Sequence, residues 1–209
     1  MARRLPVYLL LDTSGSMYGA PIEAVRNAMQ VLLSELQSDP HALETAYLSI
    51  ITFDNTANQV VPLTPILQVQ LPEIEASGCT ALGEALELLA DKLEKDIHKN
   101  SPQAKGDWKP LVFLMTDGAP TDDITNGVAK IKKAKTGTFI ACGAGPDADI
   151  DILKQFTENV VRLDALDPAQ IRSFIKWISS SIKVTSQHPG EERSGLSALP
   201  EPPETISIV

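Results

Sequence analysis

Short apolar runs alternate with amphipathic stretches along most of the chain, and this alternation constrains the fold more than any other feature. The apolar runs have the length of single strands and occupy residues 5–11, 45–53, 111–118, 136–145 and 159–165. The amphipathic stretches repeat apolar residues at helical spacing and occupy residues 21–36, 82–97, 121–135, 150–156 and 168–182. Because right-handed crossovers place helices on both faces of a parallel sheet, the pattern predicts a doubly wound, mostly parallel α/β fold.

The edge of the sheet and the end of the chain show different patterns. Residues 57–63, "ANQVVPL", follow a short polar turn and are expected to form one short antiparallel edge strand, which gives a six-stranded sheet. We expect a single domain over residues 1–184. Residues 185–209 lose helical periodicity and gain proline, which predicts a flexible or extended C-terminal tail. Its last residues, "TISIV", are β-prone and suited to adding to a sheet edge of this or another subunit.

Charge and cysteine content exclude several classes of function. The formal net charge of −9 and the pI near 4.8 disfavour nucleic acid or an anionic membrane as the main partner, because both would repel the chain. No apolar stretch approaches the roughly 20 residues that cross a bilayer, so we expect a cytoplasmic protein. Cys79 and Cys142 form no CxxC pattern, and Cys79 is expected to be a small buried filler.

Two aspartates are expected at the carboxyl ends of neighbouring strands. Asp12 closes the first apolar run, and Asp117 closes the run that begins at residue 111. In a doubly wound sheet, the crevice beyond the strand ends where the winding reverses is the usual ligand site. The two carboxylates are therefore predicted to converge on one cation.

Three hydroxyl side chains accompany these aspartates. Ser14 and Ser16 follow Asp12 at a spacing of two, which directs alternate side chains of an extended loop to the same side. Thr80, just before the helix at 82–97, is expected to bring a further oxygen to this rim. The set contains only hard oxygen donors, which suit magnesium, with manganese or calcium as alternatives, and do not suit zinc.

Each of these residues also has a purely structural interpretation. "DTSGS" at 12–16 is a reasonable turn, because Asp, Ser and Gly satisfy loop backbone groups. Thr80 is also a candidate helix cap, as is Thr121 for the helix at 121–135. Asp117 and Gly118 would suit a tight hairpin, although a helix rather than a strand is expected after them. The coincidence of all five positions favours the metal site.

"DTSGS", Thr80 in "SGCTALGEAL" and Asp117 in "LMTDG" together resemble the metal-ion-dependent adhesion site of von Willebrand factor A domains. The resemblance covers about residues 5–184, and "PVYLLLDTSGSM" and "LVFLMTDGAPTDD" are most similar to bacterial tellurite-resistance proteins of the TerY type. It implies a magnesium site held by Asp12, Ser14, Ser16, Thr80 and Asp117 and completed by an Asp or Glu of a protein partner. It also implies kinase-type, phosphatase-type or other tellurium-resistance partners in a chemical-stress response.

The favoured function is therefore a non-catalytic, metal-dependent interaction module, with no catalytic or cofactor-binding residue assigned. The alternative is a magnesium-dependent phosphotransferase of the haloacid-dehalogenase-like type, with Asp12 as nucleophile. Those enzymes use D-x-D, in which the second aspartate is a general acid, and here Ser14 occupies that position. The site therefore lacks the residue that the alternative most requires.

Overall fold

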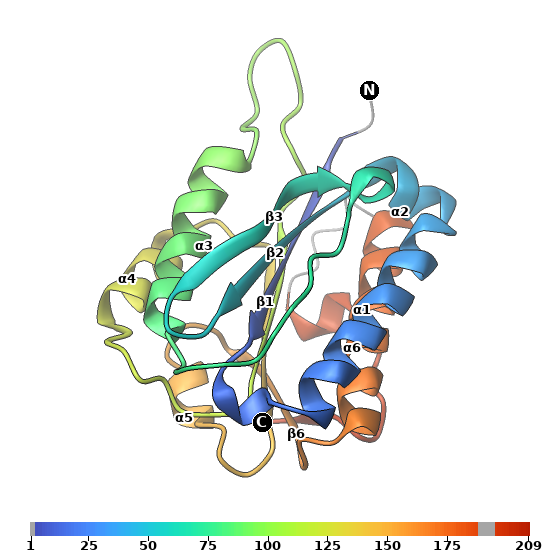
Figure 1. The fold of residues 1–209 in the computed structure, drawn as a ribbon. Helices are drawn as coiled ribbons and strands as arrows, with labels where there is room; N and C mark the ends of the chain where they lie inside the picture. The colour runs from blue at the N-terminus through green and yellow to red at the C-terminus, as the bar shows by residue number, and fades with distance from the viewer. Residues whose placement is uncertain (1–2, 188–194) are drawn as a thin grey trace.

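A computed structural model describes residues 3–187 and 195–209. Its strands are β1 Leu5–Asp12, β2 Ala46–Phe53, β3 Ala57–Pro65, β4 Leu111–Thr116, β5 Thr138–Ala144, β6 Asn159–Leu163 and β7 Ser207–Ile208. They form one sheet in the order β3-β2-β1-β4-β5-β6-β7, in which the five central strands are parallel and the two edge strands antiparallel (Figure 1). The predicted doubly wound, mostly parallel α/β fold is confirmed.

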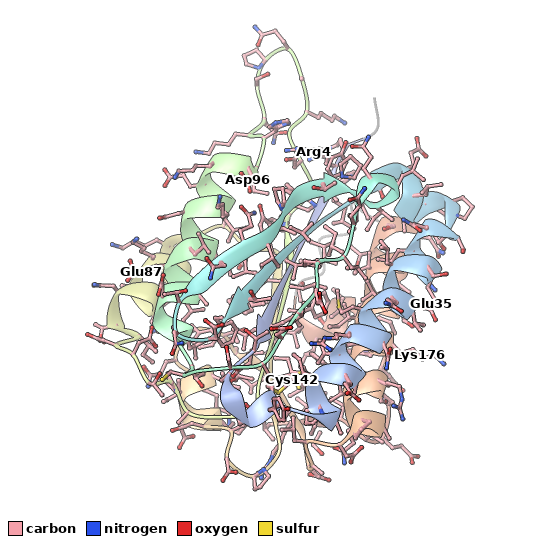
Figure 2. All side chains as sticks on the ribbon, viewed as in Figure 1. Arg4, Glu35, Glu87, Asp96, Cys142 and Lys176 are labelled. Carbon is pink, nitrogen blue, oxygen red and sulfur yellow. The ribbon has the colours of Figure 1, made fainter. Side chains whose placement is uncertain are left out.

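Helices cover both faces of this sheet. The helices are α1 Ala20–Gln37, α2 Pro40–Thr45, α3 Leu82–Asp96, α4 Thr125–Lys133, α5 Ile150–Leu153 and α6 Pro168–Gln187. One face carries α1, α2 and α6, and the other carries α3, α4 and α5 (Figure 1). On the first face Glu35 of α1 accepts hydrogen bonds from Ser179 Oγ at 2.6 Å and Lys183 Nζ at 3.0 Å, which ties α1 to α6 (Figure 2 labels Glu35).

The central strand β1 explains the continuous apolar run at the start of the chain. Leu9 and Leu11 pack into the core under α1 and α6, whereas Tyr8 and Leu10 pack into the core under α3 and α4. All eight residues of β1 are buried, because the strand has a helical layer on each side. The strand ends at Asp12, so a carboxylate is carried to the carboxyl edge of the sheet.

The C-terminal segment adds a strand that the six-stranded prediction did not count. Helix α6 runs to Gln187, so it includes the first three residues of the predicted tail, and residues 188–194 lie outside the described part. Beyond them β7 pairs antiparallel with β6 of the same chain. The Trp177 indole N–H donates to the Pro200 carbonyl at 2.8 Å, and Ile206 is buried. Because β7 occupies this edge, the sheet has seven strands rather than the predicted six. At the other edge, the predicted short antiparallel strand is β3, which is nine residues long.

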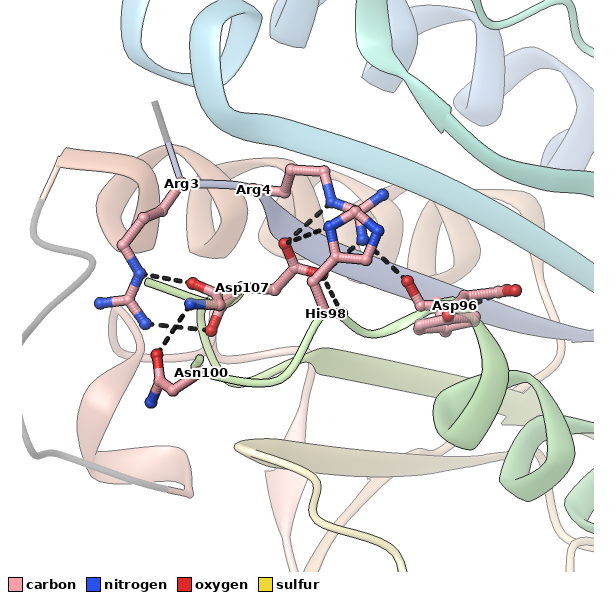
Figure 3. Close-up of polar contacts among 8 residues, drawn as sticks. Arg3, Arg4, Asp96, His98, Asn100 and Asp107 are labelled. Atoms are coloured by element: carbon pink, nitrogen blue, oxygen red, sulfur yellow. Dashed lines mark hydrogen bonds and ion pairs between the residues drawn. The ribbon is translucent and has the colours of Figure 1, made fainter. Parts of the chain in front are cut away.

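The loop between α3 and β4 is held by two arginines at the amino end of β1. Asp107 accepts hydrogen bonds from Arg4 Nε at 2.8 Å and Arg4 Nη2 at 2.5 Å, and its side chain is only 4% exposed. Arg3 Nε donates to the carbonyl of Gly106 at 2.7 Å, and Arg4 Nη2 also reaches the carbonyl of Asp96 (Figure 3). This end of the sheet therefore has a fixed loop rather than a free connection.

Candidate metal centre

Asp12 lies at the floor of the site, fully buried at the end of β1. Its Oδ1 accepts the backbone N–H of Ser14 at 2.8 Å, and its Oδ2 accepts the hydroxyl of Thr116 at 2.5 Å. Thr116 is the last residue of β4, which pairs with β1 in parallel. The two strands therefore end together, and the Asp12 carboxylate joins the loop after β1 to the last residue of β4.

Ser14 and Ser16 connect this floor to Asp117. The hydroxyls of Ser14 and Ser16 are 3.0 Å apart, and Ser16 Oγ donates to Asp117 Oδ1 at 2.8 Å. Ser14 has an extended backbone, but Gly15–Met17 form a 3-10 turn rather than the fully extended loop that the spacing suggested. The turn still brings both hydroxyls to the same side, so the expected convergence of these residues with Asp117 is observed.

Backbone contacts hold the loop that carries Thr80 beside the site, but among the described residues the Thr80 hydroxyl forms no hydrogen bond with the other four residues. The N–H of Gly15 donates to the carbonyl of Gly78 at 3.1 Å, which joins the Thr80 loop to the loop after β1. Thr80 also exchanges two bonds with Thr121, from Thr80 N–H to Thr121 Oγ1 at 3.0 Å and from Thr121 N–H to the Thr80 carbonyl at 2.9 Å. Its loop is thus held between the loops that follow β1 and β4.

Both predicted helix caps are wrong, and at α3 a residue that the sequence did not single out accepts the free N–H groups instead. Helix α3 has no side-chain cap from Thr80; the carboxylate of Asp122 accepts the N–H groups of Gly83 at 3.0 Å and Glu84 at 2.9 Å. Helix α4 begins at Thr125, and Thr121 bonds to Thr80 instead of capping it. Asp122 lies 39 residues after Gly83, so no local spacing signals the contact. Thr116, which bonds to Asp12, was also not singled out, but the sequence could have indicated it, because it is the polar last residue of an otherwise apolar strand.

The structural alternatives account for only part of these contacts. The bond from Ser14 N–H to Asp12 is an ordinary local turn contact, but the bond from Ser16 to Asp117 crosses 101 positions and serves no turn. Asp117 and Gly118 do not form a hairpin, because α4 follows them. The hydroxyls are therefore turned toward a distant carboxylate.

Burial makes the two carboxyl groups costly to ionise. The pKa of Asp12 is raised above its ordinary value by burial, although hydrogen bonds from Ser14 and Thr116 oppose the shift. The pKa of Asp117 is also raised, first by burial and then by the charge of Asp12, against the bond from Ser16. A cation between the two groups would relieve both effects.

The donor set fits a hard divalent cation. It offers two carboxylates and three hydroxyls from Asp12, Ser14, Ser16, Thr80 and Asp117, which are oxygen ligands of the kind magnesium takes. Within residues 3–187 and 195–209, no three His, Cys, Asp or Glu side chains are grouped so that they could hold a metal ion, and the candidate site, with two carboxylates, depends on its hydroxyls. Four of the five residues are buried, and Ser16 is exposed. The site is therefore open to solvent at one corner.

Two exposed side chains lie next to these residues in the chain. Tyr18 is 79% exposed although its backbone N–H is fixed to the Gly15 carbonyl at 3.2 Å. Cys79, beside Thr80, is exposed, so its expected role as a buried filler is wrong. Its backbone N–H donates to Asn55 Oδ1 at 3.2 Å, and this contact holds the residue at the surface.

The family model described as the von Willebrand factor type A domain matches residues 7–177. The chain belongs to the von Willebrand factor type A family. Domains of this family often mediate protein–protein interactions, generally without catalysis, and commonly bind a divalent metal ion. The match includes all five residues of the candidate site and ends within α6.

Relatives of this von Willebrand factor type A protein are mostly much longer. It is 27% identical over 169 residues to human inter-alpha-trypsin inhibitor heavy chain H6, covering 72% of this chain and 12% of the relative. It is 35% identical over 123 residues to an uncharacterized Synechocystis protein, covering 56% of this chain and 26% of the relative. The chain thus spans 12% and 26% of the length of these two curated relatives.

Solved structures support the fold of this von Willebrand factor type A protein. The pilus adhesin SpaC of Lactobacillus rhamnosus GG matches with a TM-score of 0.67 at 16% identity, over 88% of this chain and 31% of the adhesin. A von Willebrand factor type A protein of Catenulispora acidiphila matches with a TM-score of 0.64 at 19% identity, over 88% and 43% of the two chains.

A search of the described residues for membrane spans finds no helix with the length and apolar character to cross a bilayer.

Proposed function

We propose that this protein is a non-catalytic interaction module that binds Mg²⁺ and, through it, an acidic side chain of a protein partner. The observation that carries the proposal is a chain of hydrogen bonds. Ser16 bonds to Asp117, the hydroxyls of Ser14 and Ser16 contact each other, and the Ser14 N–H bonds to Asp12. Asp12, Ser14, Ser16, Thr80 and Asp117 are the proposed metal ligands, directly or through water. Manganese or calcium are alternatives of the same hard-oxygen class.

The composition of the site favours a carboxylate as the incoming ligand. Hydroxyls are neutral, so a set with three hydroxyls among its five donors would leave more positive charge on the ion than an all-carboxylate set would. Magnesium also keeps exchangeable water ligands, which an external carboxylate can replace. Ser16 is the exposed donor, so the partner's Asp or Glu would approach beside it.

Metal binding would exchange hydrogen bonds within the site for bonds to the ion. The hydroxyl of Ser16 now donates to Asp117, and the hydroxyls of Ser14 and Ser16 contact each other. In the metal-bound state these oxygens would offer lone pairs to the cation, and the two buried carboxylates would lose their mutual repulsion. The site is thus preassembled, which lowers the cost of binding.

The cellular setting is proposed from sequence resemblance alone. The segments "PVYLLLDTSGSM" and "LVFLMTDGAPTDD" resemble TerY-type proteins, which supports a role in a bacterial tellurium or chemical-stress system in the cytoplasm. Kinase-type, phosphatase-type or other tellurium-resistance proteins are the partners that this setting suggests. The phosphotransferase alternative has less support, since Ser14 replaces the general acid and both Asp12 oxygens accept hydrogen bonds.

The test measures Mg²⁺ binding and partner capture on the same variants. Isothermal titration should show Mg²⁺ binding to the wild type and none to Asp12→Ala, and capture of the partner should require Mg²⁺ and stop with EDTA. Asp54→Ala is the matched control, because Asp54 follows β2 at the same edge and, within the described residues, its carboxylate bonds only to Thr56 N–H in its own turn. Unaltered Mg²⁺ binding by Asp12→Ala would overturn the proposal, and phosphate-ester turnover lost in Asp12→Asn would favour the phosphotransferase.

A further inference from the structure

A groove of about 560 Å³ lies between the carboxyl-terminal halves of α3 and α4. Its apolar lining consists of Ala90, Leu93, Ile97 and Ala134. Its charged lining consists of Lys99, Lys130, Lys133, Lys135, Asp91 and Glu94. The two helices lie side by side on the face opposite α1 and α6 (Figure 1). Because Thr80 lies at the amino end of α3, the groove is at the opposite end of this helix from the candidate metal centre.

Three of the four lysines on the groove form no ion pair within the described residues, although two acids also line the groove. Lys130 is paired, with Glu87 Oε2 at 2.9 Å and Asp91 Oδ1 at 3.5 Å. Lys99, Lys133 and Lys135 are exposed, and none of them forms an ion pair within the described part of the chain. A chain with a net charge of −9 therefore presents, around an apolar floor, four lysines against two acids, and three of these lysines are unpaired in the described residues.

The backbone that carries two of these lysines is fixed before anything binds. His98 N–H donates to Asp107 Oδ2 at 2.8 Å, and Asn100 Oδ1 accepts the N–H of Gly106 at 2.7 Å, so both neighbours of Lys99 are held (Figure 3). On the other side Thr136 N–H donates to the Ala134 carbonyl at 3.1 Å, a turn that encloses Lys135. Fixed backbones reduce the ordering cost that binding must meet.

We propose that this lysine groove binds an acidic segment of a partner protein. An apolar side chain of the segment would pack on Leu93, Ile97 and Ala134. Flanking carboxylates would pair with Lys99, Lys133 and Lys135, for which charge complementarity is the argument. This second interaction surface is independent of the metal and of the proposed function of the metal centre.

A peptide fits this surface better than a membrane or nucleic acid. The groove is recessed, and Asp91 and Glu94 line it together with the lysines, so a flat anionic bilayer would meet carboxylates as well. The net charge of −9 also repels extended polyanions at long range. A short segment with separate carboxylates can pair with individual lysines and avoid these acids.

The test uses a short fluorescein-labelled peptide of glutamate, aspartate and leucine, measured by fluorescence anisotropy in EDTA so that the metal centre does not contribute. The triple variant K99Q/K133Q/K135Q should bind at least about tenfold more weakly than the wild type, which corresponds to about 1.4 kcal/mol. The control K95Q/K132Q/K154Q removes three exposed lysines that do not line the groove and should bind within about twofold. Circular dichroism of each variant checks that it is folded.

Composition controls test both parts of the surface. A peptide with glutamine and asparagine in place of its acids, and one with serine in place of leucine, should each bind more weakly. Equal binding of the triple variant and wild type, or no binding of the acidic peptide, overturns the proposal. It is also overturned if the same lysines instead support binding to phosphatidylserine vesicles, or self-association in analytical ultracentrifugation, without peptide binding.

Discussion

Ser16 and Asp117 are joined by a hydrogen bond of 2.8 Å from Ser16 Oγ to Asp117 Oδ1, although 101 positions separate them in the chain. The bond connects the loop after β1 with the loop after β4. Asp117 is 5% exposed and lies close enough to Asp12 for that charge to raise its pKa further. The contribution of Asp117 to metal binding and its effect on the free energy of unfolding can therefore be measured separately, with and without Mg²⁺.

We predict that Asp117→Asn is at least as stable as the wild type in EDTA but gains no stability from Mg²⁺. Replacing the carboxylate removes a buried charge and its repulsion from Asp12, and it also removes one of the two proposed carboxylate ligands of the metal. For the wild type, Mg²⁺ at about 100 times its Kd should add about 2.7 kcal/mol. Thermal unfolding with and without MgCl₂ checks this, and Asp54→Asn should respond to Mg²⁺ as the wild type does. An equal Mg²⁺ response in Asp117→Asn would contradict the assignment.

Mg²⁺ affinity should fall as the pH is lowered, beginning above the pH at which an ordinary aspartate protonates. The folded-state pKa values of Asp12 and Asp117 are both raised, so protons compete with the metal at a higher pH than they would at ordinary aspartates. Without metal, the free energy of unfolding should instead increase as the pH is lowered. The two buried charges destabilise the protein at neutral pH, and protonation removes this cost as the pH falls through the raised pKa values. Titrations of Mg²⁺ at constant ionic strength and decreasing pH measure the first effect, and a pH-independent Kd would contradict it.

Asp122→Ala should destabilise the protein by about 1–2 kcal/mol. Its carboxylate accepts the two N–H groups at the start of α3, and loss of such a cap typically costs this much. Asp123→Ala is the matched control, because the exposed Asp123 bonds only to Thr125 N–H in its own turn and should cost less. Urea unfolding of the two variants compares their losses in the free energy of unfolding. Equal losses would show that the bonds from Asp122 to α3 stabilise the protein no more than the local turn bond of Asp123.

Only one of the two thiols should react in the native protein. Cys79 is exposed, whereas Cys142 is fully buried and its pKa is raised by burial, which suppresses the thiolate. Titration with a chromogenic disulfide should therefore give one thiol per native chain and two after denaturation. Cys79→Ser should abolish the native reaction. A thiol that still reacts in native Cys79→Ser would show that Cys142 is accessible.

The strand ends of the candidate site were predictable because they follow from periodicity. Asp12 and Asp117 end buried apolar runs, and parallel strands necessarily bring such ends to one edge. Ser14 and Ser16 followed from their spacing to Asp12, although Gly15–Met17 form a 3-10 turn. The metal itself stays a prediction, since these contacts concern the protein's own oxygens.

The long-range contacts of the site were not predictable from one sequence. Asp122 caps a helix that begins 40 residues earlier in the chain, and Thr121 bonds to Thr80 rather than to the helix after it. Both residues are of types that commonly cap the helix just after them in the chain. Their actual hydrogen-bond partners follow from the packing of α3 against α4, which one sequence does not show. The short helix α2 was also missed, because six residues are too few to show helical periodicity.

The β6 edge depends on very few hydrogen bonds. Strand β7 pairs only Ser207 with Arg162 and Ile208 with Val161, and Val209 N–H then donates to the Val160 carbonyl at 3.1 Å. Loss of these few hydrogen bonds, for example through a bulky group attached close to β7, would leave β6 with unpaired backbone groups that a neighbouring molecule could bind. An affinity tag for binding studies is therefore better placed away from β7, so that a tag artefact is not mistaken for oligomerisation.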